Sequence, residues 1–230
     1  MKKDNFLILD SSSSVLKIGL RINNEKISLD YTDDFKHLEN IIPLMDSLLS
    51  KIENSNIKDI QNILVCNGPG SFTGIRIGLA TAYGLYSSLE NVICYGFNIF
   101  DVYNYLINQD NAVIIPIIDA KKNKFYCSFI EKNKEYQYLD LELNEIVTII
   151  AKLKEDNKNI VFTGKDFGLI RGQIHIAYEY LYPDDFKADD LISFGEYFLN
   201  NNEIKKNFPE PLYIRKSEAE ISLLHKKGIL

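Results

Sequence analysis

The residues with the clearest chemical potential lie between positions 66 and 80, where glycines and hydroxyl side chains interrupt an apolar sequence. The tripeptide Gly68–Gly70, which is Gly-Pro-Gly, is followed by Ser71 and Thr73. Glycine reaches backbone conformations closed to other residues, and a Ser or Thr at a helix start accepts a hydrogen bond from an unpaired N–H group. The pattern predicts a strand, a tight loop and a helix N-terminus, a junction that can bind an anion or pack closely against a neighbour.

The spacing of the glycines excludes a P-loop. That motif needs Gly, four residues and then Gly-Lys-Ser/Thr, whereas Gly74 follows Gly70 too soon and is itself followed by isoleucine. Two interpretations stay open. The amides from Ser71 through Thr73 to Gly74 could bind an anion together with Arg76, or the glycines could simply make the bend. Spacing alone favours the bend.

A second chemical pattern occurs twice, half a chain apart. The apolar run Phe6–Asp10 ends in Asp and is followed by a Ser-rich turn and the run Val15–Leu20. The run Ile115–Asp119 likewise ends in Asp and is followed by a turn and the run Phe125–Ile130. Each segment predicts strand, Asp, turn and strand. An Asp in this place can simply bond to the backbone of the turn, but the repetition indicates a duplicated lobe.

The elements that must position these residues alternate between helices and strands, which predicts an α/β fold. Helical spacing predicts helices over 38–52, 73–87, 144–154 and 191–199, and short apolar runs predict strands over 63–66, 92–95, 136–139 and 160–162. We place the boundary between an N-terminal lobe (1–108) and a smaller, divergent C-terminal lobe (109–230).

Composition limits the classes of function. The chain has 230 residues, of which 46% are hydrophobic and 25% are charged, an ordinary balance for a soluble globular protein. Its formal charge of −6 argues against a protein that holds nucleic acid by itself, because phosphate neutralisation needs a basic surface. Any RNA contact is therefore expected to need a partner protein.

Cysteines and the N-terminal residues indicate the compartment. Cys66, Cys94 and Cys127 are odd in number and lie in apolar runs, which fits reduced core thiols better than disulfides or a metal site. The apolar run Phe6–Leu9 is too short for a signal-peptide core or a membrane span. We expect a cytoplasmic protein without a membrane anchor.

The combination of motifs resembles one family. The segments Leu9–Ser13, His37 with Ile42–Leu49, and above all Gly68–Ala82 (Gly-Pro-Gly-Ser-Phe-Thr-Gly-Ile-Arg-Ile-Gly-Leu-Ala-Thr-Ala) are similar to the TsaB (YeaZ) family. Leu212–Arg215 extends the similarity thinly toward the C-terminus. The resemblance covers mainly the first hundred residues.

The resemblance implies a two-lobed actin-like ATPase and sugar-kinase fold with duplicated mixed-sheet lobes. It implies a non-catalytic subunit that supports a TsaD-type transferase in forming threonylcarbamoyladenosine in the tRNA anticodon loop. A TsaE-type ATPase would belong to the same system, tRNA would be reached through the complex, and ATP would be used by the wider system rather than bound by this chain alone. A homodimer is expected when the partner is absent.

The residues agree with a supporting role. A TsaD-like metal site would show two histidines one helical turn apart, yet His37, His175 and His225 are isolated in sequence. We assign no catalytic residue, no metal ligand and no cofactor-binding residue, and a peptidase is disfavoured because no paired nucleophile and base is visible.

Nucleotide binding is the alternative that the fold raises. A small-molecule kinase would use Asp10 or Asp119 to hold a metal nucleotide. The turns 11–14 and 120–123 contain no glycine to let a phosphate approach the backbone, and residues 163–168 lack adjacent glycines. We therefore expect no independent ATP turnover.

The partner surface is predicted on the first two helices. Gly74, Gly78 and Ala82 fall four apart and line one side of a helix, where small side chains would let another backbone come close. The apolar stripe of the preceding helix is wide enough to present some residues outward. From that stripe we select Leu38, Ile42, Met45 and Leu49. Two helices from each of two related subunits would make a four-helix contact; the rival interpretation is that both helices pack only on their own sheet.

Overall fold

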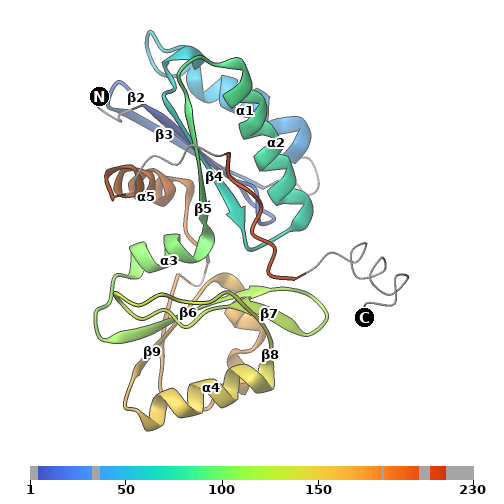
Figure 1. The fold of residues 1–230 in the computed structure, drawn as a ribbon, viewed down its shortest axis with the longest axis vertical. Helices are drawn as coiled ribbons and strands as arrows, with labels where there is room; N and C mark the ends of the chain where they lie inside the picture. Colours follow the sequence, from blue (N-terminus) through green and yellow to red (C-terminus); the bar gives the residue numbers. More distant parts are fainter. Residues whose placement is uncertain (1–4, 33–36, 183, 202–207, 216–230) are drawn as a thin grey trace.

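The structure, a computed structural model, describes residues 5–32, 37–182, 184–201 and 208–215, with only the backbone described for 37–39. It consists of two lobes, each built on a five-stranded sheet (Figure 1). The expected two-lobed α/β organisation is confirmed.

The first sheet has the spatial order β3-β2-β1-β4-β5. Its strands are β1 (Phe6–Asp10), β2 (Leu16–Ile22), β3 (Glu25–Tyr31), β4 (Asn62–Gly68) and β5 (Ile93–Asn98). The first three strands are antiparallel, whereas β4 and β5 run parallel to β1. Parallel neighbours need crossover connections, which here contain α1 (His37–Leu49) with the short η1 (Ile57–Asp59), and α2 (Phe72–Ser88).

The second sheet repeats this plan. Its strands are β6 (Ala112–Asp119), β7 (Lys124–Cys127), β8 (Leu139–Glu142), β9 (Asn159–Thr163) and β10 (Glu179–Leu181), in the order β10-β9-β6-β7-β8. Again three strands are antiparallel and two lie parallel to the first of them. The same connectivity therefore occurs twice, which confirms that the two Asp-turn hairpins mark duplicated lobes.

The second lobe is reduced in its helices. α4 (Leu143–Glu155) corresponds in chain order to α1. Where the first lobe has α2, the second has only two short 3-10 helices, η2 (Lys165–Leu169) and η3 (Arg171–Gln173).

Three hydrophobic clusters form the core. One lies between the first sheet and α1 and α2, and another lies between the second sheet and α4. The largest is built around α3 (Ile99–Ile107) and α5 (Ala188–Asn201) and contains residues of both sheets, such as Phe6 and Val161. Because the lobes share this core, their packing against one another is apolar as well as polar.

The helix α5 returns to the first lobe after the second lobe is complete. It packs against β1, β2 and β3, on the face of the sheet opposite α1 and α2 (Figure 1). α5 therefore packs on the first lobe although it follows the second lobe in the chain. The boundary between the lobes at 108/109 stays a prediction.

Several predicted elements shift or appear anew. The strand predicted over 136–139 is wrong, since the strand there is β8, which begins at Leu139. β3, α3 and β10 were not predicted. α3 is short and mostly apolar, and Ile99, Phe100, Val102 and Tyr103 are all buried at the junction of the lobes. Among the described helices, none is long and apolar enough to cross a membrane.

The buried thiols give a test of the core. Burial raises the pKa of Cys94 and of Cys127 from 9.0 to about 12, and burial together with the charge of Asp10 raises the pKa of Cys66 well above its usual value. Since the thiolate is the reactive form, we expect the native protein at pH 8 to resist an aromatic disulfide reagent. All three thiols should react after unfolding in guanidinium. These groups favour the folded state below pH 9 and lose that contribution as the pH rises toward 12; rapid labelling of native protein at pH 8 would contradict the burial.

Candidate functional site

The glycine-rich junction packs against the Ser-rich turn of the first hairpin. Ser71 is the N-cap of α2: its Oγ accepts a hydrogen bond from the Gly74 N–H at 3.2 Å, and its own N–H donates to the Ser12 carbonyl at 2.7 Å. A Cβ on Gly74 would lie 1.9 Å from the Ser11 carbonyl oxygen, and a Cβ on Gly70 would lie 2.4 Å from that of Ser12. The glycines therefore let two backbone segments of this chain come into contact.

Three groups of the predicted anion site already have partners within the chain. The N–H groups of Ser71 and Gly74 are bonded as described, and Thr73 is exposed. The Arg76 Nε donates to the Tyr213 hydroxyl at 2.8 Å. The anion site stays a prediction.

The small residues of α2 face the protein's own interior, which corrects their assignment to a partner surface. Gly74, Gly78 and Ala82 are all buried. A Cβ on Gly78 would lie 2.4 Å from the Ser11 Oγ, which itself donates to the Gly74 carbonyl at 2.8 Å. Spacing of four residues defines a face of a helix but not the neighbour that covers it.

The residues of the predicted apolar stripe on α1 differ in their exposure. Met45 and Leu49 are buried in the cluster under the first sheet, so their assignment to the partner surface is also wrong. Ile42 points to solvent and is 53% exposed. The side chain of Leu38 lies outside the described residues.

An exposed apolar surface does exist on these helices. We call it the outer face and define it by Ile42 on α1 and by Tyr83 and Tyr86 on α2, which are 57% and 37% exposed. α1 and α2 lie side by side (Figure 1). Next to Tyr83, Gly84 would have no atom within 4 Å of an added Cβ. Both tyrosines were missed in the sequence, although large aromatic side chains between exposed positions are a usable signal of an interface.

Residues 208–215, which we call the strap, lie along α2 and continue to the second lobe. The Phe208 ring packs against Tyr83 at 5.2 Å between ring centroids. The Leu212 N–H donates to the Asn67 carbonyl at 2.7 Å. Arg215 makes a two-pronged ion pair with Asp140 of β8, at 2.7 and 2.6 Å. The strap therefore contacts both lobes (Figure 1).

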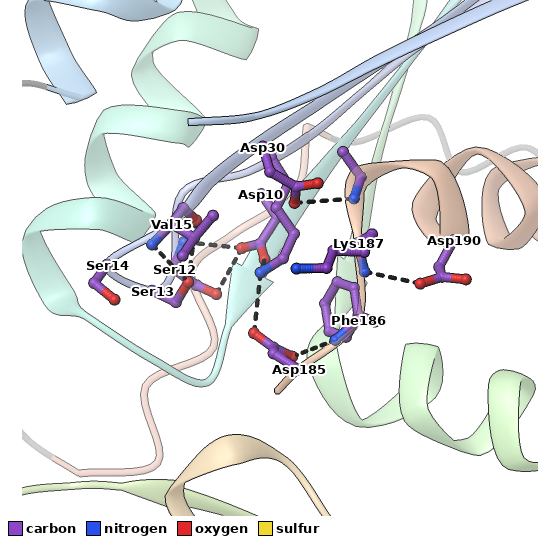
Figure 2. A network of polar contacts seen from close by, with 12 residues as sticks. Asp10, Ser12, Ser13, Ser14, Val15, Asp30, Asp185, Phe186, Lys187 and Asp190 are labelled. Atoms are coloured by element: carbon purple, nitrogen blue, oxygen red, sulfur yellow. Dashed lines mark hydrogen bonds and ion pairs between the residues drawn. The ribbon is translucent and has the colours of Figure 1, made fainter. Parts of the chain in front are cut away.

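The first Asp turn lies deep between the lobes. Asp10 is fully buried, and its Oδ1 accepts hydrogen bonds from the N–H and the hydroxyl of Ser12 at 2.8 and 2.6 Å. Its Oδ2 has no hydrogen-bond donor and lies 3.7 Å from the Lys17 Nζ. Figure 2 shows Asp10 and Asp185 approaching the same point from different segments.

A buried lysine neutralises this turn. The Lys17 Nζ donates to Asp185 Oδ2 at 3.1 Å and lies 4.5 Å from the centre of the Phe186 ring. The Tyr103 hydroxyl donates to the other Asp185 oxygen at 2.6 Å. Burial alone lowers the pKa of Lys17, but the charges of Asp10 and Asp185 and the hydrogen bond to Asp185 outweigh it, so the pKa is raised.

The second Asp turn has a different environment. Asp119 is 24% exposed and pairs with Lys121, whose Nζ lies 2.7 Å from its Oδ2. Partial burial opposes ionisation of Asp119, but the hydrogen bonds and charge of Lys121 outweigh it and lower its pKa. The Asp119 N–H donates to Asp166 at 2.9 Å, and the Lys165 Nζ donates to the Ser14 hydroxyl at 3.0 Å across the lobes.

Little space remains between the two turns. A cavity of about 40 Å³ is lined by residues of both lobes, among them Asp10, Asp166 and Asp185. This volume suits a few water molecules rather than a nucleotide. Among the described residues, no group of three or more His, Cys, Asp or Glu side chains is placed to hold a metal ion.

The sequence of this chain is similar to those of known proteins. The model of the family "TsaD: tRNA N6-adenosine threonylcarbamoyltransferase" matches residues 34–162. A tRNA threonylcarbamoyladenosine biosynthesis protein TsaB of Bacillus subtilis is 28% identical over 178 residues, covering 73% of this chain and 74% of that protein. The TsaB protein of Escherichia coli is 22% identical over 195 residues, covering 80% and 83%.

Solved structures agree on the fold. A structure titled "YeaZ from Pseudomonas aeruginosa" superposes with a TM-score of 0.68 at 17% identity, covering 92% of this chain and all of that one. A second Pseudomonas aeruginosa structure, described as similar to peptidase YEAZ, gives a TM-score of 0.70 at 18% identity with the same coverage.

The repeated sheet connectivity, with an Asp turn in each lobe, defines a protein of the two-lobed actin-like ATPase and sugar-kinase fold. The match to the family model over more than half of the chain then shows the family to which this protein belongs. This chain belongs to the TsaB (YeaZ) family, within the wider family of TsaD-like sequences.

Proposed function

We propose that this chain is a non-catalytic subunit that binds a TsaD-type transferase and supports it in forming threonylcarbamoyladenosine in the tRNA anticodon loop. The single observation that carries the proposal is the outer face. Ile42, Tyr83 and Tyr86 expose large apolar side chains on two adjacent helices in a chain whose relatives are named for this biosynthesis. Such residues at the centre of a contact contribute most of its binding energy.

The wider system supplies what this chain lacks. We propose that a TsaE-type ATPase uses the ATP, that tRNA is reached through the complex because this chain carries a net charge of −6, and that the complex works in the cytoplasm. Without its partner, the chain would pair with a second copy through the same outer face.

Binding to the partner tests the proposal. Ile42→Asp and Tyr83→Asp each place a charge in the proposed contact, and each should weaken binding to a TsaD-type protein by about 30-fold or more. Titration calorimetry or light scattering at micromolar concentration measures the change. Folding of each variant is checked by its melting temperature, because both side chains are exposed and should tolerate the change.

Leu169→Asp is the matched control. Leu169 is 60% exposed, close to the value for Tyr83, but lies on η2 in the second lobe. It should bind the partner as the unmodified chain does. No complex with the unmodified chain, or equal losses in all three variants, would contradict the proposed interface.

Activity separates this proposal from the kinase alternative. In a reconstituted system, tRNA modification should require this chain, and Ile42→Asp should reduce it. Phosphate release from ATP by the pure protein would instead favour the kinase. The part of the chain that the structure describes does not favour the kinase, since Asp10 is already paired inside the protein.

A further inference from the structure

The polar network around Lys17 joins segments that belong to different parts of the fold. Lys17 lies on β2 and Asp10 at the end of β1, both in the first sheet. Tyr103 lies on α3, the helix between the two sheets. Asp185 lies on the connection from β10, in the second sheet, to α5, which packs on the first. One ammonium group therefore contacts carboxylates from both sides of the lobe junction.

The burial of this group is unusual for a lysine. Its side chain is 2% exposed, beside Asp10 at 0% and Asp185 at 12%. Lysine is almost never fully buried unless it is paired, and removing one partner of a buried pair leaves an uncompensated charge. The Asp10 Oδ2 has no hydrogen-bond donor, so Lys17 at 3.7 Å is the cation that balances it.

The surroundings select a compact cation with N–H groups. The Asp185 Oδ2 accepts from the ammonium, and the Phe186 ring covers another side of it. An aromatic face attracts a cation. Both carboxylates also line the cavity of about 40 Å³ at the lobe junction, together with Asp166 and Lys165.

We propose that Asp10 and Asp185 form a cation-binding site whose resident ligand is the Lys17 ammonium group, and that this internal cation holds the two lobes in one fixed arrangement. The site is closed from inside, so an external cation cannot enter while Lys17 is present. The inference concerns the isolated chain and does not depend on the proposed transferase partner.

Chemical rescue tests the site directly in the full chain. Lys17→Ala keeps the Cβ and removes three methylenes and the ammonium group, which together correspond to n-propylammonium. We expect the melting temperature to fall by roughly 10 °C, and n-propylammonium chloride to restore at least half of the loss. Tetramethylammonium chloride at the same concentration supplies equal ionic strength without N–H groups and should restore none.

Two further variants keep the outcome decisive. Lys26→Ala removes a lysine that pairs at the surface with Glu196, so its melting temperature should change little and should not respond to propylammonium. Lys17→Met keeps the volume but not the charge, and should speed hydrogen exchange in α3 and in residues 184–187. If Lys17→Ala folds only with propylammonium, the site is supported.

The proposal is overturned by any of three results. They are a Lys17→Met variant as stable as Lys26→Ala, equal rescue by both ammonium salts, and exchange that stays unchanged at the lobe junction. If Lys17→Ala does not fold in either salt, the Lys17→Met variant decides alone, by its stability relative to Lys26→Ala and by its hydrogen exchange at the lobe junction.

Discussion

Gly74→Ala is expected to destabilise the protein by about 3 kcal/mol or more, because a single methyl group would overlap the backbone of another segment. The added Cβ would lie 1.9 Å from the Ser11 carbonyl oxygen. That oxygen belongs to the tight turn after β1, and the Ser11 Oγ also donates to the Gly74 carbonyl, so neither segment can move alone. Urea unfolding followed by circular dichroism measures the loss.

The same helix offers a matched control. Gly84 also lies within α2, and a Cβ there would meet no atom within 4 Å. Because alanine favours a helix over glycine, Gly84→Ala should stabilise the protein by about 0.5–1 kcal/mol. Opposite signs at Gly74 and Gly84 are the expected result. Similar stabilities for the two variants would mean that α2 does not contact the Ser-rich turn as described.

Asp10→Asn is expected to destabilise the protein by about 3 kcal/mol, since it removes a buried charge that balances Lys17. The amide still fills the space and can accept from Ser12, but its NH₂ group would bring a donor toward the ammonium. Thermal and urea unfolding of the pure variant measure the effect.

Asp119→Asn is the control at the equivalent position of the other lobe. Asp119 is partly exposed and its ion pair with Lys121 is solvated, so the change should cost less than about 1 kcal/mol. The comparison also addresses the kinase alternative. If Asp10 were reserved for a metal nucleotide, its neutralisation would preserve or improve stability while removing activity.

The sequence predicted the repeated architecture well, because each lobe begins with a strand that ends in Asp at a tight turn. It failed for short elements. α3 has nine residues and is mostly apolar because it packs at the junction of the lobes. The strand predicted over 136–139 is displaced because aromatic residues such as Tyr136 pack around Asp101 and Asn98 instead of extending β8.

The candidate site was predicted only in part. The glycine-rich junction was expected to pack closely against a neighbour, and Gly74 to admit another backbone, but the approaching segment comes from the first hairpin, which no local pattern reveals. Lys17 was not singled out, since a lysine in a strand usually faces solvent. Only the fold brings it to Asp185, far along the chain.

The late return of α5 has a consequence for how the protein forms on the ribosome. The inner side of the first sheet, including Phe6 and Ile8, is covered by α5, which ends at residue 201. A growing chain therefore carries this apolar surface uncovered until the second sheet and then α5 have emerged. The lobe whose strands are synthesised first is thus completed after the second one.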